Sequence, residues 1–309
     1  MKHRLEYALV RSIAACVRVL PVSLVRACGG VLGRLAYRVD GFHRRVALEN
    51  LAQAFPTRPP QELQVLAREM FKHFGRLLLE LIKFGGLSND EILRRVEIEG
   101  EERARLAEQQ GRGVLYFTGH FGYWEMQAIV HALRRRPVAV LARPLDNPHL
   151  HVMLERIRTR TGNSVIYRQG AIRKMLRELA LNRGIAMLID QHLHTPDAVF
   201  VDFFRRPAAT TSALAALALR TGAPVIPVFA LPLPHGRYRL VYEHPVDPPR
   251  ADTADAVRDF TQRCTDVLEM YVRRHPALWL WMHRRWRDHD VLNGEDFLMR
   301  DESDEGDDV

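Results

Sequence analysis

One stretch, residues 113–125, places a histidine between a buried strand and a helix. The uninterrupted apolar run Val114–Phe117 predicts a buried strand, and Thr118 with the glycine after it supplies a turn. Apolar residues then recur at helical spacing over residues 124–133. We therefore expect His120 to lie at the edge of a sheet, where the chain passes from a strand into a helix.

The spacing from His120 to Glu125 predicts chemistry at that edge. A carboxylate one turn into the helix can fix the tautomer of the imidazole and stabilise its protonated form, as a general base requires. Two other histidines are followed by an acidic residue five positions later, in His192/Asp197 and His283/Asp288. Only the His120 pair coincides with a strand–turn–helix junction flanked by glycines. We expect it to be functional, the alternative being an ordinary capping histidine.

From residue 111 onward the apolar pattern alternates between strand and helix periods. The expected strands are 114–118, 137–142, 164–167, 185–189, 224–230 and 237–243, and the expected helices are 121–135, 148–161, 169–182, 211–220 and 252–274. Before them we expect helices at 43–56, 61–84 and 101–110, a capping box at Ser88–Glu91 and a strand at 96–99. This predicts an α/β fold, with a mostly parallel or mixed central sheet flanked by helices on both faces.

The amino-terminal segment indicates contact with a membrane. Arg4, Arg11 and Arg18 recur every seven residues among apolar side chains, and a second arginine-bearing apolar segment, residues 24–37, follows Pro21. A wide apolar face with a narrow basic stripe suits a helix lying in the membrane interface. The alternative is an amphipathic helix packed on its own core. No stretch approaches 18 uncharged apolar residues, so neither a clean membrane-spanning helix nor a signal peptide is expected.

We therefore divide the chain into three parts. We expect residues 1–40 to form amino-terminal membrane-associating helices, residues 41–290 one domain, and residues 291–309 an acidic, disordered tail. The net charge is +8, but residues 301–309 carry six acidic and no basic groups, which leaves the rest at +14. An arginine-rich body suits phosphate or carboxylate partners: nucleic acid, anionic lipid or an acidic carrier protein. The three cysteines lack the spacing of a zinc site or a disulfide framework, which fits a reducing compartment.

Further polar groups follow other expected strands. Arg143 ends the strand 137–142, and Asp190 and Gln191 end the strand 185–189, so these side chains should face one ligand crevice. Arg143 can polarise a carbonyl oxygen or hold a phosphate, the alternative being an ordinary surface arginine. A metal site would use Asp190, His192, His194 and Asp197. Two histidines at i and i+2 form no recognised zinc pattern, and we do not favour that site.

Two later segments leave alternatives open. Hydroxyls at residues 210–212, at the start of a small-residue helix, can bind an anion or simply cap the helix. Residues 279–287 mix tryptophan with arginine, which suits either the stacking of nucleotides or a membrane surface near an anionic lipid. No glycine-rich phosphate loop, nucleophile elbow or nucleic-acid-binding motif is recognisable.

These motifs together resemble the bacterial lipid A biosynthesis acyltransferases, the lauroyl and myristoyl transferases of the lysophospholipid-acyltransferase-like superfamily. The resemblance covers residues 40–288 in the family's order. Its matching segments are Asn50-Leu51, Ala54-Phe55-Pro56, His120–Glu125, Arg143–Pro148, Asp190-Gln191, Ala209-Thr210-Thr211, Thr221–Phe229 and Trp279–Trp286.

The resemblance implies an acyltransferase that moves a fatty acyl group from acyl-carrier-protein thioester to a hydroxyl of a phosphorylated glycolipid. His120 would be the general base and Glu125 its partner, without an acyl-enzyme, a metal or a cofactor. The substrate contacts expected with them are Arg143, Asp190, Gln191, Thr210, Arg284 and Arg285. The enzyme would lie on the cytoplasmic face of the cell inner membrane, peripherally or by a single amino-terminal anchor, with no nucleic-acid partner.

Some features depart from the family's pattern. Arg205 stands where a glycine is expected, and residues 192–197 are an unusual insert. These departures bear on the acceptor more than on the reaction, and relatives that acylate phosphatidylinositol mannosides make another glycolipid or phospholipid an alternative. Two readings from other classes remain: a metal-dependent hydrolase, and a non-catalytic basic protein that binds membrane or nucleic acid.

Overall fold

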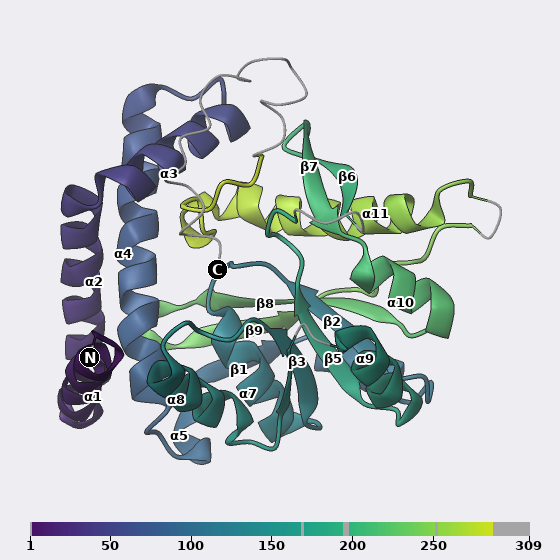
Figure 1. Cartoon of the computed structure of the whole chain (residues 1–309), viewed down its shortest axis with the longest axis horizontal. Helices are drawn as coiled ribbons and strands as arrows, with labels where there is room; N and C mark the ends of the chain where they lie inside the picture. Colours follow the sequence, from purple (N-terminus) through teal and green to yellow (C-terminus); the bar gives the residue numbers. More distant parts are fainter. Residues whose placement is uncertain (1, 168–169, 194–197, 251–252, 287–309) are drawn as a thin grey trace.

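The structure is a computed structural model of the whole chain, and it describes residues 2–167, 170–193, 198–250 and 253–286 (Figure 1). The helices are α1 (Lys2–Val19), α2 (Val22–Val39), α3 (Gly41–Ala54), α4 (Pro60–Phe84), α5 (Asn89–Leu93), α6 (Glu101–Glu108), α7 (Trp124–Arg134), α8 (Pro148–Thr159), α9 (Ala171–Ala180), α10 (Ala213–Thr221) and α11 (Ala256–Arg274). The strands are β1 (Val96–Glu99), β2 (Val114–Thr118), β3 (Val138–Ala142), β4 (Ser164–Tyr167), β5 (Gly184–Leu188), β6 (Ala198–Phe203), β7 (Arg206–Thr211), β8 (Val225–Pro232) and β9 (Tyr238–Tyr242). Two short 3₁₀ helices are η1 (Pro234–Gly236) and η2 (Pro276–Leu278).

Seven strands form one sheet in the order β1-β9-β8-β2-β5-β3-β4. Every neighbouring pair is parallel except β8 and β9, which form an antiparallel pair. The two strands on either side of β2 are thus β8 and β5, which come from later in the chain. The predicted α/β class with a mostly parallel sheet is confirmed.

Strand β2 lies in the middle of this sheet and is buried along its whole length. Leu115 and Phe117 join a core that includes residues of α4, α9, α10 and α11, whereas Val114 and Tyr116 join a second core with residues of α6 and α7. Successive strand residues point to opposite faces, so one apolar run supplies both cores. This explains why the run shows no alternation of polar and apolar residues.

The expected strands match the observed ones closely, but the helix after His120 starts later than predicted. Helix α7 begins at Trp124 rather than near Phe121. The backbone NH of Gly122 donates to the carbonyl of Leu278, and that of Tyr123 to the carbonyl of Ala230. Tertiary hydrogen bonds therefore hold residues 121–123 outside the helix.

The hairpin of β6 and β7 was not expected from the sequence. Its turn residues Phe204 and Arg205 both have positive φ, 56° and 61°. This left-handed region favours glycine, and Arg205 is the residue that stands where a glycine was expected. The turn holds its shape because Phe204 is buried against Trp281 and its NH donates to Glu269 Oε2.

The first two helices pack mainly on α4. Helix α2 lies along α4, and α1 contacts α4 and α8 (Figure 1). Their outer faces stay exposed and apolar, with exposed side chains at Leu5, Leu9, Ile13, Val19, Leu24, Val31, Leu32, Leu35 and Val39. Among the described residues, no helix has the length and apolar character needed to cross a membrane.

The contact between α2 and α4 depends on glycine. A methyl group on Gly33 would overlap the carbonyl group of Phe71 and lie 2.7 Å from Lys72 Cα. We expect Gly33→Ala to separate the helices and to lower the free energy of unfolding by about 1–3 kcal/mol, measured by urea denaturation. The control is Gly41→Ala at the exposed start of α3, where only the tip of Arg44 lies within reach. Equal stability of the two variants would contradict this account of the packing.

Candidate active site

Two loops meet at the carboxyl edge of the sheet. Thr118 of β2 pairs in parallel register with Leu188 of β5, and two residues beyond each lie His120 and Asp190. Because the strands are parallel, both loops leave the sheet at the same edge. The edge therefore brings together two residues that are 70 positions apart.

Asp190 is the direct partner of His120. Its Oδ1 lies 2.8 Å from His120 Nδ1, and its Oδ2 accepts from the backbone NH of His120 at 2.6 Å. Oδ2 also accepts from Trp279 Nε1 at 2.7 Å. An ionised carboxylate accepts only, so Nδ1 carries the proton and Nε2 has the lone pair of the neutral ring. The His120 side chain is 16% exposed and that of Asp190 3%, so the imidazole is partly exposed and its partner is enclosed.

The electrostatics follow from this pairing. Burial by itself would lower the pKa of His120, but the charge and hydrogen bond of Asp190 outweigh it and raise the pKa above its usual value. Burial opposes ionisation of Asp190, yet the bonds from His120 and Trp279 lower the pKa of that carboxyl to about 2. The carboxylate stays ionised at neutral pH and favours the imidazolium form of His120.

Glycines allow the loop around His120 to approach its neighbours. A Cβ on Gly119 would lie 2.8 Å from Asp190 Oδ2, so the carboxylate occupies the space of a side chain. Gly122 has φ +57°, and a Cβ there would overlap the Ala230 carbonyl oxygen. The His120 carbonyl accepts from Leu280 NH at 3.0 Å, so residues 278–280 hold the loop from the other side.

Glu125 does not contact His120 as the sequence predicted. Its carboxylate forms a two-pronged ion pair with Arg158 of α8, with Arg158 Nε 2.9 Å from Oε2 and Nη2 on Oε1. The prediction that Glu125 orients His120 by direct contact is therefore wrong. The carboxylate that contacts His120 is Asp190, from the loop after β5. Glu125 acts on His120 only as a more distant negative charge that helps to raise its pKa.

Five of the six expected substrate contacts fall into two groups, one exposed and one buried. Arg143 and Gln191 are exposed after β3 and β5, at the same edge as His120. Arg285, 1% exposed, donates to Ala209 O and to Thr210 Oγ1, which is itself fully buried. A substrate cannot reach Thr210 or Arg285, so their assignment as substrate contacts is wrong. Asp190 is also buried, and both of its carboxylate oxygens accept hydrogen bonds from His120, so it is a partner of His120 rather than a substrate contact.

The three tryptophans of residues 279–286 are part of the core. Trp279, Trp281 and Trp286 are at most 4% exposed, which excludes nucleotide stacking or membrane contact for these three side chains. Arg284 lies over the Phe42 ring, 5.3 Å from its centroid. Two side chains of this segment support the loop that carries Asp190. The indole of Trp279 donates to Asp190 Oδ2, and the guanidinium of Arg285 donates to Gln191 O at 3.5 Å.

The metal site suggested by the sequence is only partly covered by the structure. His194 and Asp197 lie outside the described residues. Among the residues that are described, no three histidine, cysteine or acidic side chains come close enough to share a metal ion. His192 instead donates its backbone NH to His283 Nε2 at 3.1 Å, and burial lowers the pKa of His283 to about 4.

The pairing predicts how His120 titrates. Asp190→Asn removes the negative charge and should lower the pKa of His120, whereas Glu125→Gln should lower it less because Arg158 neutralises Glu125. The measurement is an NMR titration of the histidine ring signals, with the His120 signal identified by its loss in His120→Gln. A larger decrease in Glu125→Gln than in Asp190→Asn would contradict the assignment of Asp190 as the partner.

Comparison with known proteins identifies the family of the chain. The family model described as bacterial lipid A biosynthesis acyltransferase matches residues 2–288. The lipid A biosynthesis lauroyltransferase of Escherichia coli (strain K12) is 27% identical over 270 residues, covering 87% of this chain and 87% of the relative. The myristoyltransferase of the same organism is 26% identical over 253 residues, covering 81% and 77%. The phosphatidylinositol mannoside acyltransferase of Mycolicibacterium smegmatis (strain ATCC 700084 / mc(2)155) is 24% identical over 275 residues, covering 87% and 88%. The chain is an acyltransferase and belongs to the bacterial lipid A biosynthesis acyltransferase family.

Proposed function

We propose that the enzyme moves a fatty acyl group from acyl-carrier-protein thioester to a hydroxyl of a lipid A precursor or related glycolipid. The observation that carries the proposal is the His120–Asp190 pair, which keeps Nε2 basic and directed away from its partner at an accessible sheet edge. The basic body of the chain suits both an acidic carrier protein and a phosphorylated lipid.

In the proposed reaction, His120 Nε2 removes the proton of the acceptor hydroxyl as its oxygen attacks the thioester carbonyl. Asp190 stabilises the imidazolium that forms, and the proton then passes to the departing thiolate as the C–S bond breaks. One C–O bond forms, one C–S bond breaks, and the carrier leaves as a free thiol without an acyl-enzyme. Arg143, at the same edge, is the proposed donor to the developing oxyanion.

The exposed faces of α1 and α2 support membrane association. Leu5 and Leu9 are each more than 60% exposed, and Arg4, Arg11 and Arg18 on the same helix are exposed as well. Exposed leucines beside arginines suit insertion into an interface that contains anionic lipid. We propose residues 1–40 as the membrane-associating part, residues 41–290 as the catalytic part, and the cytoplasmic face of the inner membrane as the location.

A second candidate acceptor is a phosphatidylinositol mannoside-like lipid. The likeness to the mycobacterial enzyme, which spans most of both chains, favours it. Both acceptors present sugar hydroxyls, so His120 would have the same task with either. The hydrolase and binding-protein alternatives differ in that neither transfers an acyl group to a lipid.

The test is transfer of labelled acyl groups from acyl-carrier protein to a panel of membrane glycolipids. His120→Ala should lower the rate by a factor of order 10² or more because the general base is lost. In Asp190→Asn, the rise of kcat/KM with pH should shift to lower pH, since the base is active only when it is unprotonated. The control is His244→Ala, an exposed residue whose described hydrogen bond comes only from its backbone NH.

The results of this assay distinguish between the proposed acceptors, and between acyl transfer and the other reaction classes. The labelled product identifies the acceptor, whether lipid A precursor or mannoside. Equal transfer by wild type and His120→Ala would exclude His120 as the base. Absence of transfer to every lipid would exclude acyl transfer to the lipids of the panel, and loss of activity with a chelator would favour the hydrolase.

Membrane association is tested separately by vesicle sedimentation. The double change Leu5→Glu with Leu9→Glu should sharply reduce binding to vesicles that contain anionic phospholipid, because two acidic groups enter the apolar face. Leu106→Glu on α6, at a side chain that is 53% exposed, is the matched control. If both proteins sediment like wild type, the face of α1 is not the membrane-binding surface.

A further inference from the structure

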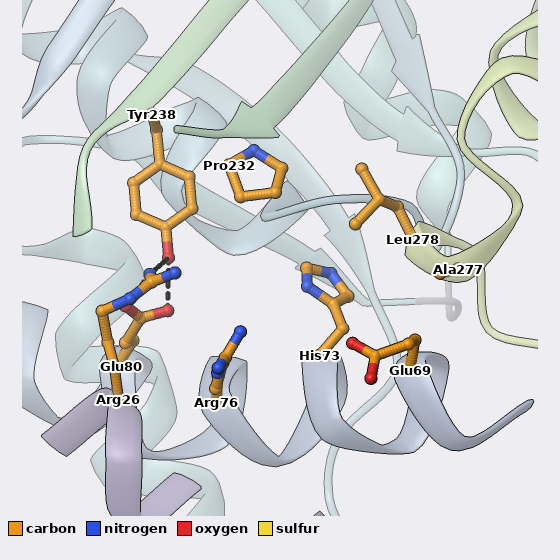
Figure 2. A pocket seen from close by; sticks show the side chains of 9 residues that line it. All are labelled: Arg26, Glu69, His73, Arg76, Glu80, Pro232, Tyr238, Ala277 and Leu278. Atoms are coloured by element: carbon orange, nitrogen blue, oxygen red, sulfur yellow. Dashed lines mark hydrogen bonds and ion pairs between the residues drawn. The ribbon is translucent and has the colours of Figure 1, made fainter. Parts of the chain in front are cut away.

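A cavity of about 130 Å³, partly open to solvent, lies between α4 and residues of α2, β8, β9 and η2. Residues of α2, α4, β8, β9 and η2 surround it, and Figure 2 shows them: Arg26, Glu69, His73, Arg76, Glu80, Pro232, Tyr238, Ala277 and Leu278. His120 is not among these residues. The cavity is therefore a separate site from the sheet edge.

Three of the polar side chains in the cavity satisfy one another. Arg26 Nη1 lies 2.5 Å from Glu80 Oε1 and 3.2 Å from the Tyr238 hydroxyl, which donates to the other Glu80 oxygen (Figure 2). Glu80 is 1% exposed, and this arrangement neutralises its charge. The second carboxylate, Glu69, pairs with Lys72 at 2.8 Å. Both acidic groups of the cavity therefore have a cation.

Arg76 is the cation that remains. Its Nε is buried, and the guanidinium makes no hydrogen bond or ion pair with any residue that the structure describes. Figure 2 shows the side chain directed into the space between Glu80 and His73. The residue as a whole is only partly buried, but its buried Nε has no acceptor among the described residues, and an unsatisfied buried donor is costly. A guanidinium with such a donor at a cavity is suited to bind an anion.

We propose that this cavity binds an anionic group of the phosphate class, with Arg76 as its principal ligand. A guanidinium fork matches two phosphate oxygens, and the small volume suits a phosphate group rather than an extended molecule. The group comes from a lipid headgroup or from free phosphate. The proposal goes beyond the proposed function, since anion binding does not depend on acyl transfer.

The cavity is connected to the loop of the candidate active site. His73 Nε2 lies 3.1 Å from the carbonyl of Gly122, to which it donates, two residues after His120. Burial lowers the pKa of His73 to about 4, so the ring is neutral and adds no cation of its own. The backbone NH of Gly122 donates to Leu278, which also lines the cavity. An anion held by Arg76 would thus lie beside the groups that fix this loop.

The test uses the full chain with two probes: inorganic phosphate in calorimetry, and phosphatidylcholine vesicles with or without phosphatidylglycerol in sedimentation. Arg76→Gln should weaken phosphate binding about ten-fold or more, the loss expected for a charge-assisted hydrogen bond. The matched control is Arg68→Gln, an exposed arginine two turns earlier on α4, which should bind like wild type.

The results separate the sources of the anion. Weaker phosphate binding in Arg76→Gln alone supports a site for free phosphate. A defect of that variant alone on phosphatidylglycerol vesicles, without phosphate binding by wild type, supports a headgroup site. Equal binding by wild type and Arg76→Gln to both probes, or equal losses in the two variants, would overturn the proposal. If Arg76→Gln does not fold, Arg76→Lys keeps the charge, removes Nε, and should still bind more weakly.

Discussion

The buried carboxylate of Asp190 is the interaction on which the site depends. A carboxylate that is 3% exposed is stable only when hydrogen bonds replace its water, and here three donors do so. Two of them belong to His120 and the third to Trp279, so the charge draws the β2 loop and the segment 279–286 onto the β5 loop. His283 and Arg285 extend this contact by binding the backbone at residues 192 and 191. One charge thus fixes three segments that are distant in the sequence.

The consequence for the proposed reaction is that His120 is held in place before substrate arrives. The backbone of His120 donates to Asp190 and accepts from Leu280, and its ring lies 5.3 Å from the ring of Trp124. A side chain fixed on several sides loses little freedom in the transition state, which is the advantage of a preorganised site. The absence of a side chain at Gly119 makes this possible, because the carboxylate takes its place.

The sequence predicted the sheet and the position of His120, since both depend on local patterns: the apolar run of β2, its turn and the helix after it. It could not predict which carboxylate faces His120. Glu125 has the suggestive spacing, but the answer depends on the strand order, which places β5 beside β2. The pairing of Arg158 with Glu125 could not be predicted either, because Arg158 is one of several arginines in its region. The tryptophans of residues 279–286 were visible, yet aromatic residues mixed with arginine look the same in a core as at an interface, and only burial separates the two.

The position of Glu125 can be understood without contact to His120. Glu125 stands in the first turn of α7, where a negative charge is favourable, and its pair with Arg158 ties α7 to α8. Trp124, the residue before it, lies between the rings of His120 and Phe74. Holding the start of α7 therefore holds the indole ring that contacts His120. Glu125 then bears on the position of His120 and on its charge, while Asp190 after β5 supplies the hydrogen bond to the ring. Two acidic residues, Asp190 and Glu125, therefore raise the pKa of His120, whereas the spacing in the sequence predicted Glu125 alone.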